Sequence, residues 1–375
     1  MSPSWGDRFR PHLANVTPYA SARRSGARGL LLDANENALG PVAGSGSGWV
    51  TGAGGVNGDG VAFDAPADSE TDSLHRYPDP SGGALRPRLA TYLGVPADRL
   101  WIGSGADDAI DVLVRTLLDP GQQLVTISPT YDLYAQRATA HGASVRAVRL
   151  DDAFDLDVDA TVDAARGAQL VILCSPNNPT GRLLSRERVL AVLERTEAVV
   201  AVDEAYVEFA GDVSMAGIAG GDGTGNRLAV IRTFSKAWGL AGLRTGYLVG
   251  DAALVDMMDV VGLPYRLTTP AIRLATAALE AREEMERRTE WLRAERGRVA
   301  EGLSGIGLRV LPSDANFLLF FVRDPAEVQR RLAEDHAITI RRRDGQPGLA
   351  GALRVTIGTA AQNDRFITAM EEVIR

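Results

Sequence analysis

The sequence of 375 residues has little of several residue types that define common classes of site. It contains one cysteine, Cys174, and four histidines, and its aromatic content is 6%. A single cysteine cannot form a disulfide within the chain, and four scattered histidines offer no zinc constellation. No apolar run reaches the roughly 18 residues of a membrane-spanning helix, and residues 1–16 do not resemble a signal peptide. We therefore expect a cytoplasmic protein without a metal or a membrane as partner.

Basic charge is supplied almost entirely by arginine. Of the 40 basic side chains only Lys236 is a lysine, and the formal net charge of −8 argues against a nucleic-acid partner. Arginine can bind phosphate, but its guanidinium does not give up a proton to become a free amine. A Schiff base requires such an amine. The composition alone leaves two interpretations of Lys236 open, a solvated lysine and a covalent catalyst.

Regular structure is predicted from about residue 85 onward. Helical periodicity covers 84–94 and 106–119, and a short strand or turn is expected at 99–105. Apolar runs predict further strands at 123–128, 144–150, 170–174, 198–203, 228–233 and 244–250. Strands that are almost continuously apolar and separated by helices are typical of a mainly parallel α/β sheet covered on both faces.

A change of pattern after residue 270 predicts a second domain. Residues 270–303 have the spacing of one long, charged helix, and short strands and helices follow it. We expect an N-terminal arm at 1–30 packing with the small domain, a large domain at 31–270 and a small α+β domain at 271–375. The glycine-rich stretch 41–73 is predicted to be a flexible loop of the large domain.

Two loops follow predicted strands at places where ligands bind in open α/β sheets. The segment GSGADDAID (103–111) opens a helix, so the amides of Gly105, Ala106 and Asp107 are candidates for binding an anion. A dinucleotide fingerprint would need a third glycine where Asp108 stands. In SPNNPTG (175–181), the two asparagines either cap the next helix or offer an amide to a ligand, and taken alone the pair favours capping.

The remaining candidates surround the single lysine in the sequence. Asp203 follows a buried strand, where a carboxylate either caps the next turn or faces a cationic ring nitrogen. Thr233, Ser235 and Arg244 flank Lys236 and together suit a phosphate. Cys174 ends an apolar strand and is interpreted as a small buried hydrophobe.

Taken in order, these segments resemble the fold-type I aminotransferases that use pyridoxal 5′-phosphate, and among them the histidinol-phosphate aminotransferase subfamily. The resemblance runs from TPYASARR (17–24) to LRVTIGT (353–359) apart from 41–73, and it includes LDANEN (32–37), HRYPDP (75–80), DEAYVEF (203–209) and SKAWGLAGLR (235–244). It implies a large domain with a mainly parallel seven-stranded sheet between helices, and a smaller α+β domain.

The resemblance also implies a role for each candidate at the cofactor. Lys236 corresponds to the catalytic Schiff-base lysine, and Asp203 to the partner of the pyridine nitrogen. Asn178 and Tyr206 resemble the pair that binds the ring hydroxyl oxygen, and Tyr131 the aromatic that stacks on the ring. The phosphate would be held by Gly105, Ala106, Asp107, Thr233, Ser235 and Arg244. Tyr77 matches a tyrosine that reaches the neighbouring subunit's cofactor, which implies a homodimer.

On the substrate side the resemblance implies four residues. Arg354 matches the arginine that receives a carboxylate, Arg341 and Tyr19 match groups around a substrate phosphate, and Asn35 lies in a segment lining the entry. The implied reaction is a ping-pong transamination between L-histidinol phosphate and 2-oxoglutarate that gives imidazole-acetol phosphate and glutamate, as in histidine biosynthesis.

Departures from the subfamily pattern keep other readings open. The loop at 41–73 is long, Trp238 and Gly239 replace smaller aromatic and aliphatic residues, and Arg342 and Arg343 add charge beside Arg341. An aromatic amino acid aminotransferase or a decarboxylase of a phosphorylated amino acid, both of this fold, are the alternatives. A pyridoxal-phosphate effector domain of a transcription regulator would need a DNA-binding segment longer than 1–30, and a nicotinamide-dependent oxidoreductase lacks its third glycine.

Overall fold

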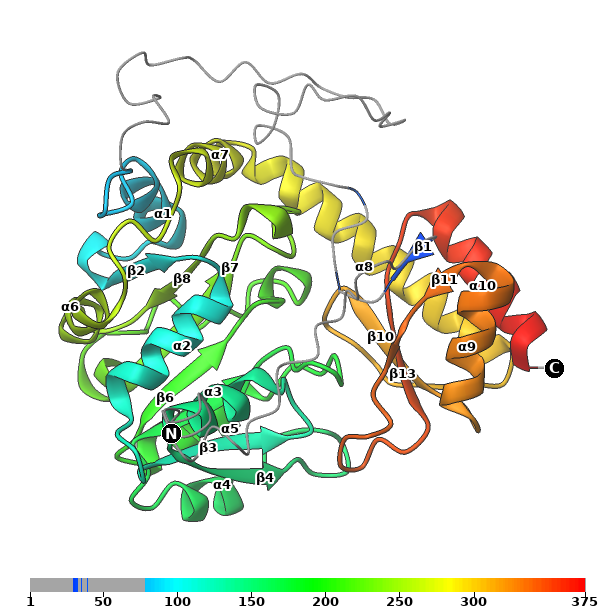
Figure 1. Ribbon diagram of the computed structural model, residues 1–375, viewed down its shortest axis with the longest axis horizontal. Helices are drawn as coiled ribbons and strands as arrows, with labels where there is room; N and C mark the ends of the chain where they lie inside the picture. The colour runs from blue at the N-terminus through cyan, green and yellow to red at the C-terminus, as the bar shows by residue number, and fades with distance from the viewer. Residues whose placement is uncertain (1–29, 33–34, 36–38, 40–77, 375) are drawn as a thin grey trace, which may run out of the picture.

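The computed structural model describes residues 30–32, 35, 39 and 78–374. Tyr19, Tyr77 and the predicted loop at 41–73 lie outside these ranges, and so does nearly all of the predicted arm. Figure 1 shows a larger body built on one sheet, with the last strands and helices of the chain forming a second group beside it. Helix α8 runs between the two groups.

The large body is organised by a sheet of seven strands in the order β2-β8-β7-β6-β5-β3-β4. Of these seven only β8 runs antiparallel to its neighbours, so the sheet is mainly parallel, as predicted. The predicted strand ends agree with the structure within two residues. The strands are β2 (Leu100–Gly103), β3 (Gln123–Ser128), β4 (Ser144–Arg149), β5 (Leu170–Cys174), β6 (Val199–Asp203), β7 (Leu228–Thr233) and β8 (Gly246–Val249).

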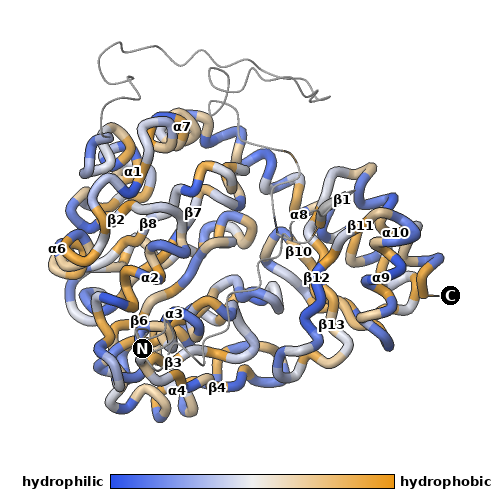
Figure 2. The backbone as a smooth tube through the Cα atoms, in the orientation of Figure 1, coloured by the Kyte–Doolittle hydropathy of each residue, from blue (hydrophilic) through white to orange (hydrophobic). Residues whose placement is uncertain are grey.

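Helices cover both faces of this sheet because its central strands are apolar on both sides. Alternate residues of a strand point to opposite faces, so Val171 and Ile172 of β5 belong to two different buried clusters. Figure 2 shows the corresponding hydrophobic colour along the central strands. The helices are α1 (Leu85–Leu93), α2 (Ala106–Leu117), α3 (Leu133–His141), α4 (Val158–Ala164), α5 (Arg186–Arg195), α6 (Ala252–Val261) and α7 (Thr269–Glu280). One cluster includes α2, α3 and α6, and the other includes α1, α4, α5 and α7.

The C-terminal group is built on an antiparallel sheet of four strands in the order β12-β13-β10-β9. These are β9 (Arg309–Val310), β10 (Phe317–Phe321), β12 (Arg341–Arg342) and β13 (Ala352–Thr356), accompanied by α9 (Pro325–His336) and α10 (Ala360–Ile374). Near the start of the chain, β1 (Leu30–Leu31) pairs in parallel with β11 (Ile338–Thr339) of this group. The described residues 30–32 therefore pair with C-terminal strands. The predicted domain limits themselves stay predictions.

The single long helix predicted at 270–303 is wrong. The structure has two helices there, α7 and α8 (Arg282–Gly305), separated at Ala281. The backbone of Ala281, with φ −96° and ψ 30°, leaves the helical region. The sequence has no glycine or proline at this point, so no helix-breaking residue indicated the interruption. The two segments face different neighbours, since α7 packs on α1 and α8 continues to the C-terminal group.

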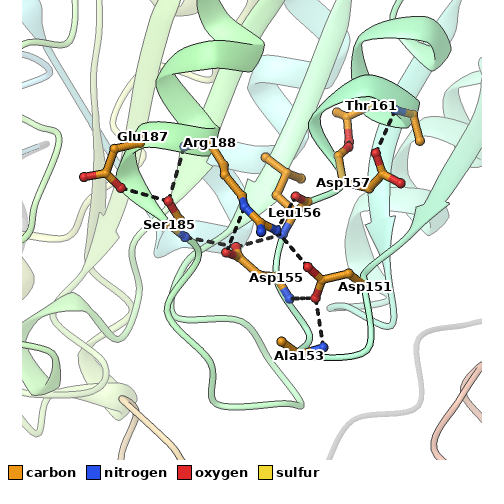
Figure 3. A network of polar contacts seen from close by, with 10 residues as sticks. Asp151, Ala153, Asp155, Leu156, Asp157, Thr161, Ser185, Glu187 and Arg188 are labelled. Carbon is orange, nitrogen blue, oxygen red and sulfur yellow. Dashed lines mark hydrogen bonds and ion pairs between the residues drawn. The ribbon is translucent and has the colours of Figure 1, made fainter.

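A polar network ties the loop after β4 to the start of α5. Arg188 Nη1 donates to Asp151 Oδ2 at 2.8 Å and to the carbonyl of Leu156 at 2.9 Å. The amide of Ser185, which is the N-cap of α5, donates to Asp155 Oδ1 at 3.0 Å. Figure 3 shows how these contacts join both segments. The network fixes the end of the loop that follows β5 and carries Asn178.

Candidate active site

The candidate residues converge because the parallel strands of the large sheet end at one edge. Gly103 ends β2, Cys174 ends β5, Asp203 ends β6 and Thr233 ends β7. Cys174 is buried, which confirms its interpretation as a core residue, and burial raises the pKa of its thiol. The loops that leave these strands therefore start side by side, although their residues span positions 103 to 244.

Asp203 is 3% exposed, so its carboxylate depends on neighbouring donors. The hydroxyl of Tyr134 donates to Oδ2 at 2.6 Å, and the amide of Ala205 donates to Oδ1 at 3.0 Å. The turn-capping contact considered for Asp203 is thus present, but it uses one oxygen only. Burial raises the pKa of Asp203 to about 6, while the two hydrogen bonds and the charge of Lys236 act in the opposite direction. A cation placed beside this carboxylate would lower its pKa again.

Lys236 lies in the loop after β7 and is partly buried. Its Nζ stands 5.7 Å from the centre of the Tyr206 ring, and its charge acts on Asp203. Tyr206 itself is buried, and this burial raises the pKa of its hydroxyl. The single lysine, the tyrosine and the carboxylate therefore lie close together.

A cradle suited to an anion is formed where α2 begins beside the loop after β7. The first amides of a helix lack acceptors within it and carry the positive end of the helix dipole. Thr233 Oγ1 lies 2.9 Å from Ser235 Oγ, and both hydroxyls are buried. Arg244 reaches across to the start of α2, where Nη2 donates to Asp107 Oδ2 at 3.2 Å. The structure thus brings the predicted phosphate-binding residues together.

Two glycines permit this close approach. A Cβ on Gly105, whose φ is +92°, would stand 2.7 Å from Arg244 Nη2. A Cβ on Gly246 would stand 2.4 Å from the amide nitrogen of Ala106. Larger residues at either position would displace the helix start from β8 or from Arg244. Gly246 is therefore required by its contact with the backbone of α2, whereas Gly105 is required mainly by its positive φ.

Tyr131 and Asn178 lie in the loops that follow β3 and β5. The hydroxyl of Tyr131 donates to Asp107 Oδ1 at 3.2 Å, which links it to the cradle, and its ring meets that of Tyr134 edge to face. Asn178 Oδ1 accepts a hydrogen bond of 2.6 Å from Arg354 Nη1. This contact orients the Asn178 amide, so that its NH₂ is turned away from Arg354. It also joins the loop after β5 to β13 of the C-terminal group.

The expectation that the asparagine pair caps the next helix is wrong. Helix α5 is capped by Ser185, whose hydroxyl accepts from the amide of Arg188 at 3.3 Å. Asn177 instead braces the loop after β3, because its Nδ2 donates to the carbonyl of Pro129 at 2.9 Å and its Oδ1 accepts from Thr130. Seven residues, 179–185, separate the pair from the helix, and the sequence of the pair alone does not show that length.

The predicted substrate residues within the described ranges lie on the C-terminal side of the site. Arg354 is 2% exposed, and Arg341 is its register partner on the adjacent strand β12. Asn35 is buried, and its Nδ2 donates to the Tyr206 hydroxyl at 3.0 Å. The additional arginines are neutralised locally, since Arg342 pairs with Asp344 at 2.7 Å and Arg343 lies 3.6 Å from Asp132.

Three residues of the site were missed in the sequence. Tyr134 binds Asp203, Thr356 binds Asn35, and the amide of Asn316 donates to the carbonyl of Asn35 at 3.0 Å. Tyr131 precedes α3 and Tyr134 lies in its first turn, so helical spacing alone did not indicate that Tyr134 belongs with Tyr131. No sequence pattern near Thr356 or Asn316 indicates that they belong to the site, because their partner Asn35 lies about 300 positions away in the chain.

Within residues 30–32, 35, 39 and 78–374, no group of three or more His, Cys, Asp or Glu side chains is arranged to hold a metal ion. None of the helices formed by these residues is both long and apolar enough to cross a membrane.

Comparison with known proteins gives matches over almost the whole chain. The family model of aminotransferase class I and II matches residues 60–370. A histidinol-phosphate aminotransferase of Roseiflexus castenholzii is 35% identical, covering 97% of this chain and 98% of the relative, and one of Parabacteroides distasonis is 33% identical, covering 98% of both. The crystal structure of histidinol-phosphate aminotransferase from Sinorhizobium meliloti in complex with pyridoxal-5′-phosphate superposes with a TM-score of 0.83 at 27% identity, over 98% of each chain.

Proposed function

The chain belongs to the class I and II aminotransferases, a family of pyridoxal-phosphate-dependent transaminases, and from this premise we propose that it transfers an amino group between L-histidinol phosphate and 2-oxoglutarate. The names of the similar proteins supply the substrate. The structural observation that carries the proposal is the register pairing of Arg341 with Arg354 beside the site. Two guanidinium groups suit a phosphate and also the two carboxylates of the second substrate.

The described residues fit pyridoxal phosphate at three separate points. The cradle of α2, Thr233, Ser235 and Arg244 suits the phosphate, and Gly105 and Gly246 keep it open. The buried carboxylate of Asp203 suits a cationic ring nitrogen, and Lys236 suits the aldehyde carbon. Tyr131 is proposed to stack on the ring, and Asn178 and Tyr206 to bind its hydroxyl oxygen. When bound, the cofactor supplies an electron sink for the substrate Cα.

Three residues of the chain have separate proposed roles in transfer of the substrate Cα proton. With the cofactor bound, Lys236 Nζ would accept the proton from substrate Cα and could give it up again, because an amine can act as base and acid in turn. Asp203 keeps its negative charge while a cation faces it, which holds the ring nitrogen protonated. Arg354 orients the substrate carboxylate and, through its bond to Asn178, ties that orientation to the ring.

We further propose a homodimer in which Tyr77 completes the partner's site. Residues 257–265 expose four large apolar side chains, Met257, Val260, Leu263 and Tyr265, and Val260 is 76% exposed. Several exposed apolar side chains in one short segment are typical of an interaction site. The paired variant Val260→Asp with Leu263→Asp should lower the mass measured by light scattering to that of one chain. Ile218→Asp, which also charges an exposed apolar residue, serves as the control and should leave the mass unchanged. A wild-type protein of single-chain mass would refute the dimer.

The proposed substrate is tested by single half-reactions followed through the absorbance of the bound cofactor. Purified protein should be yellow, and borohydride should attach the cofactor to the peptide containing Lys236. Histidinol phosphate and glutamate should each, at low substrate concentration, change the absorbance of the bound cofactor to that of its aminated form. Phenylalanine and phosphothreonine serve as comparison substrates, since the first lacks a phosphate and the second is open to decarboxylation. Faster conversion of either comparison substrate would overturn the proposed specificity, and release of carbon dioxide would overturn transamination.

A further inference from the structure

Asn35 is buried and is held by hydrogen bonds through both its backbone and its side chain. It is 1% exposed, and its φ of +54° lies in the left-handed region that asparagine tolerates better than most residues. Its carbonyl accepts from Asn316 Nδ2 at 3.0 Å, and its amide donates to Thr356 Oγ1 at 2.9 Å. The backbone on both sides of the side chain is therefore held by the C-terminal group.

The same contacts determine which way the side-chain amide points. Because Thr356 Oγ1 accepts the backbone amide of Asn35, its own proton is available for Asn35 Oδ1, which lies 3.2 Å away. With the oxygen directed at Thr356, the NH₂ group faces Tyr206 and donates to its hydroxyl at 3.0 Å. The amide orientation thus follows from the hydrogen-bond pattern.

A tyrosine hydroxyl that accepts one hydrogen bond must direct its own proton to a different atom. Tyr206 is also held in place by the edge of Phe317, whose ring centre is 5.2 Å away. In the site proposed above, the acceptor for this proton is the hydroxyl oxygen of the cofactor ring. Asn35 would therefore act on the cofactor through Tyr206, to whose hydroxyl its side-chain NH₂ donates.

We propose that Asn35 is a positioning residue that directs the Tyr206 proton onto the ring oxygen of the cofactor. This inference rests on the proposed function, because it requires that the cofactor lie against Tyr206. A hydrogen bond donated to the ring oxygen favours the state in which that oxygen is negatively charged. Loss of the bond should raise the pH midpoint of the absorbance change of the substrate-free holoenzyme.

The experiment compares this midpoint in wild type, Tyr206→Phe, Asn35→Gly, Asn35→Asp and the double variant Tyr206→Phe/Asn35→Gly. Tyr206→Phe should raise the midpoint by about one pH unit. Asn35→Gly keeps the left-handed backbone accessible and should shift the midpoint in the same direction by less. Asn35→Asp should match Tyr206→Phe, since a carboxylate would accept the tyrosine proton. The double variant should equal Tyr206→Phe alone, because Asn35 has no other route to the ring.

Two further variants keep the test decisive if Asn35 variants fold poorly. Thr356→Val removes the hydroxyl that orients the Asn35 amide and should raise the midpoint, whereas Thr356→Ser retains that hydroxyl and should restore the wild-type value. Asn226→Asp, at an exposed position, controls for the change from asparagine to aspartate. If Asn35→Gly leaves the midpoint unchanged but raises KM, the inference is overturned and a substrate contact is indicated. Additive midpoint shifts in the double variant would also overturn the inference. A wild-type protein without a cofactor band would instead refute the proposed function.

Discussion

The cofactor side and the substrate side of the site are assembled in different ways. The proposed cofactor side, which comprises Gly105 to Asp107, Asp203, Tyr206 and residues 233–244, is built from loops that leave strands β2, β6 and β7 of one sheet. The proposed substrate side comprises Arg341 and Arg354, which lie on C-terminal strands. Asn35 is held to the same strands by a bond with Thr356 that spans 321 positions. A parallel sheet gathers the first group as soon as it forms, whereas the second group exists only once the C-terminal strands have docked. Changes on the two sides should therefore affect different measured quantities.

The strongest test of the cofactor side is Lys236→Arg. Arginine preserves the positive charge, but its guanidinium stays protonated and cannot form the Schiff base or act as a base. We expect turnover to fall by a factor on the order of 10⁴ or more, as for other residues that act covalently. Steady-state assay gives kcat, and fluorescence titration of the apoprotein gives the affinity for pyridoxal phosphate, which should fall far less. Substantial turnover by this variant would remove Lys236 from its proposed role.

Arg354→Ala should have the next largest effect because this residue touches both sides. It removes a buried charged donor and leaves Asn178 Oδ1 without the 2.6 Å bond that orients it. We expect kcat/KM to fall on the order of 10²–10³-fold, the range for truncating one partner of a buried charged hydrogen bond. The cofactor absorbance should change as well. Arg341→Ala is the matched control because Arg341 is only partly buried. This variant should raise KM and leave the cofactor absorbance spectrum unchanged.

Asp203→Asn separates the stability of the apoprotein from cofactor binding. Burial raises the folded-state pKa of Asp203 from an ordinary value near 3.8 to about 6. The stability that this group contributes is present below pH 4 and is lost as the pH rises through 6. Asparagine does not titrate, so the variant apoprotein should gain about 2–3 kcal/mol relative to wild type between pH 4 and pH 7. Urea unfolding at both pH values measures this. If the stability difference between variant and wild-type apoprotein does not change with pH, the raised pKa is contradicted. In the holoprotein, wild type should be more stable than Asp203→Asn.

The contrast between the two sides also explains what could be predicted from sequence. Apolar runs and the residues directly after them predicted the sheet and the positions of Asp203 and Thr233, because strand ends are local features. The wrong expectations arose where local pattern was the only guide. Ala281 interrupts a continuous helical pattern, and Asn177 braces the loop after β3 rather than a helix. Tyr134 and Thr356 depend on packing between elements, which no spacing rule describes.

The smallest effect is expected for Arg342→Ala, which tests which of three adjacent arginines serves the substrate side. Arg342 is exposed, and Asp344 holds its guanidinium at 2.7 Å and raises its pKa. Exposed ion pairs contribute about 0.2–1 kcal/mol, so the melting temperature should change little. KM for both substrates should stay within about twofold of wild type, because this charge is already neutralised by its neighbour. Arg343→Ala should cost more stability, since Arg343 is 9% exposed and lies 3.6 Å from Asp132 in the large body. A large rise in KM for Arg342→Ala, with Arg341→Ala unaffected, would move the proposed phosphate contact from Arg341 to Arg342.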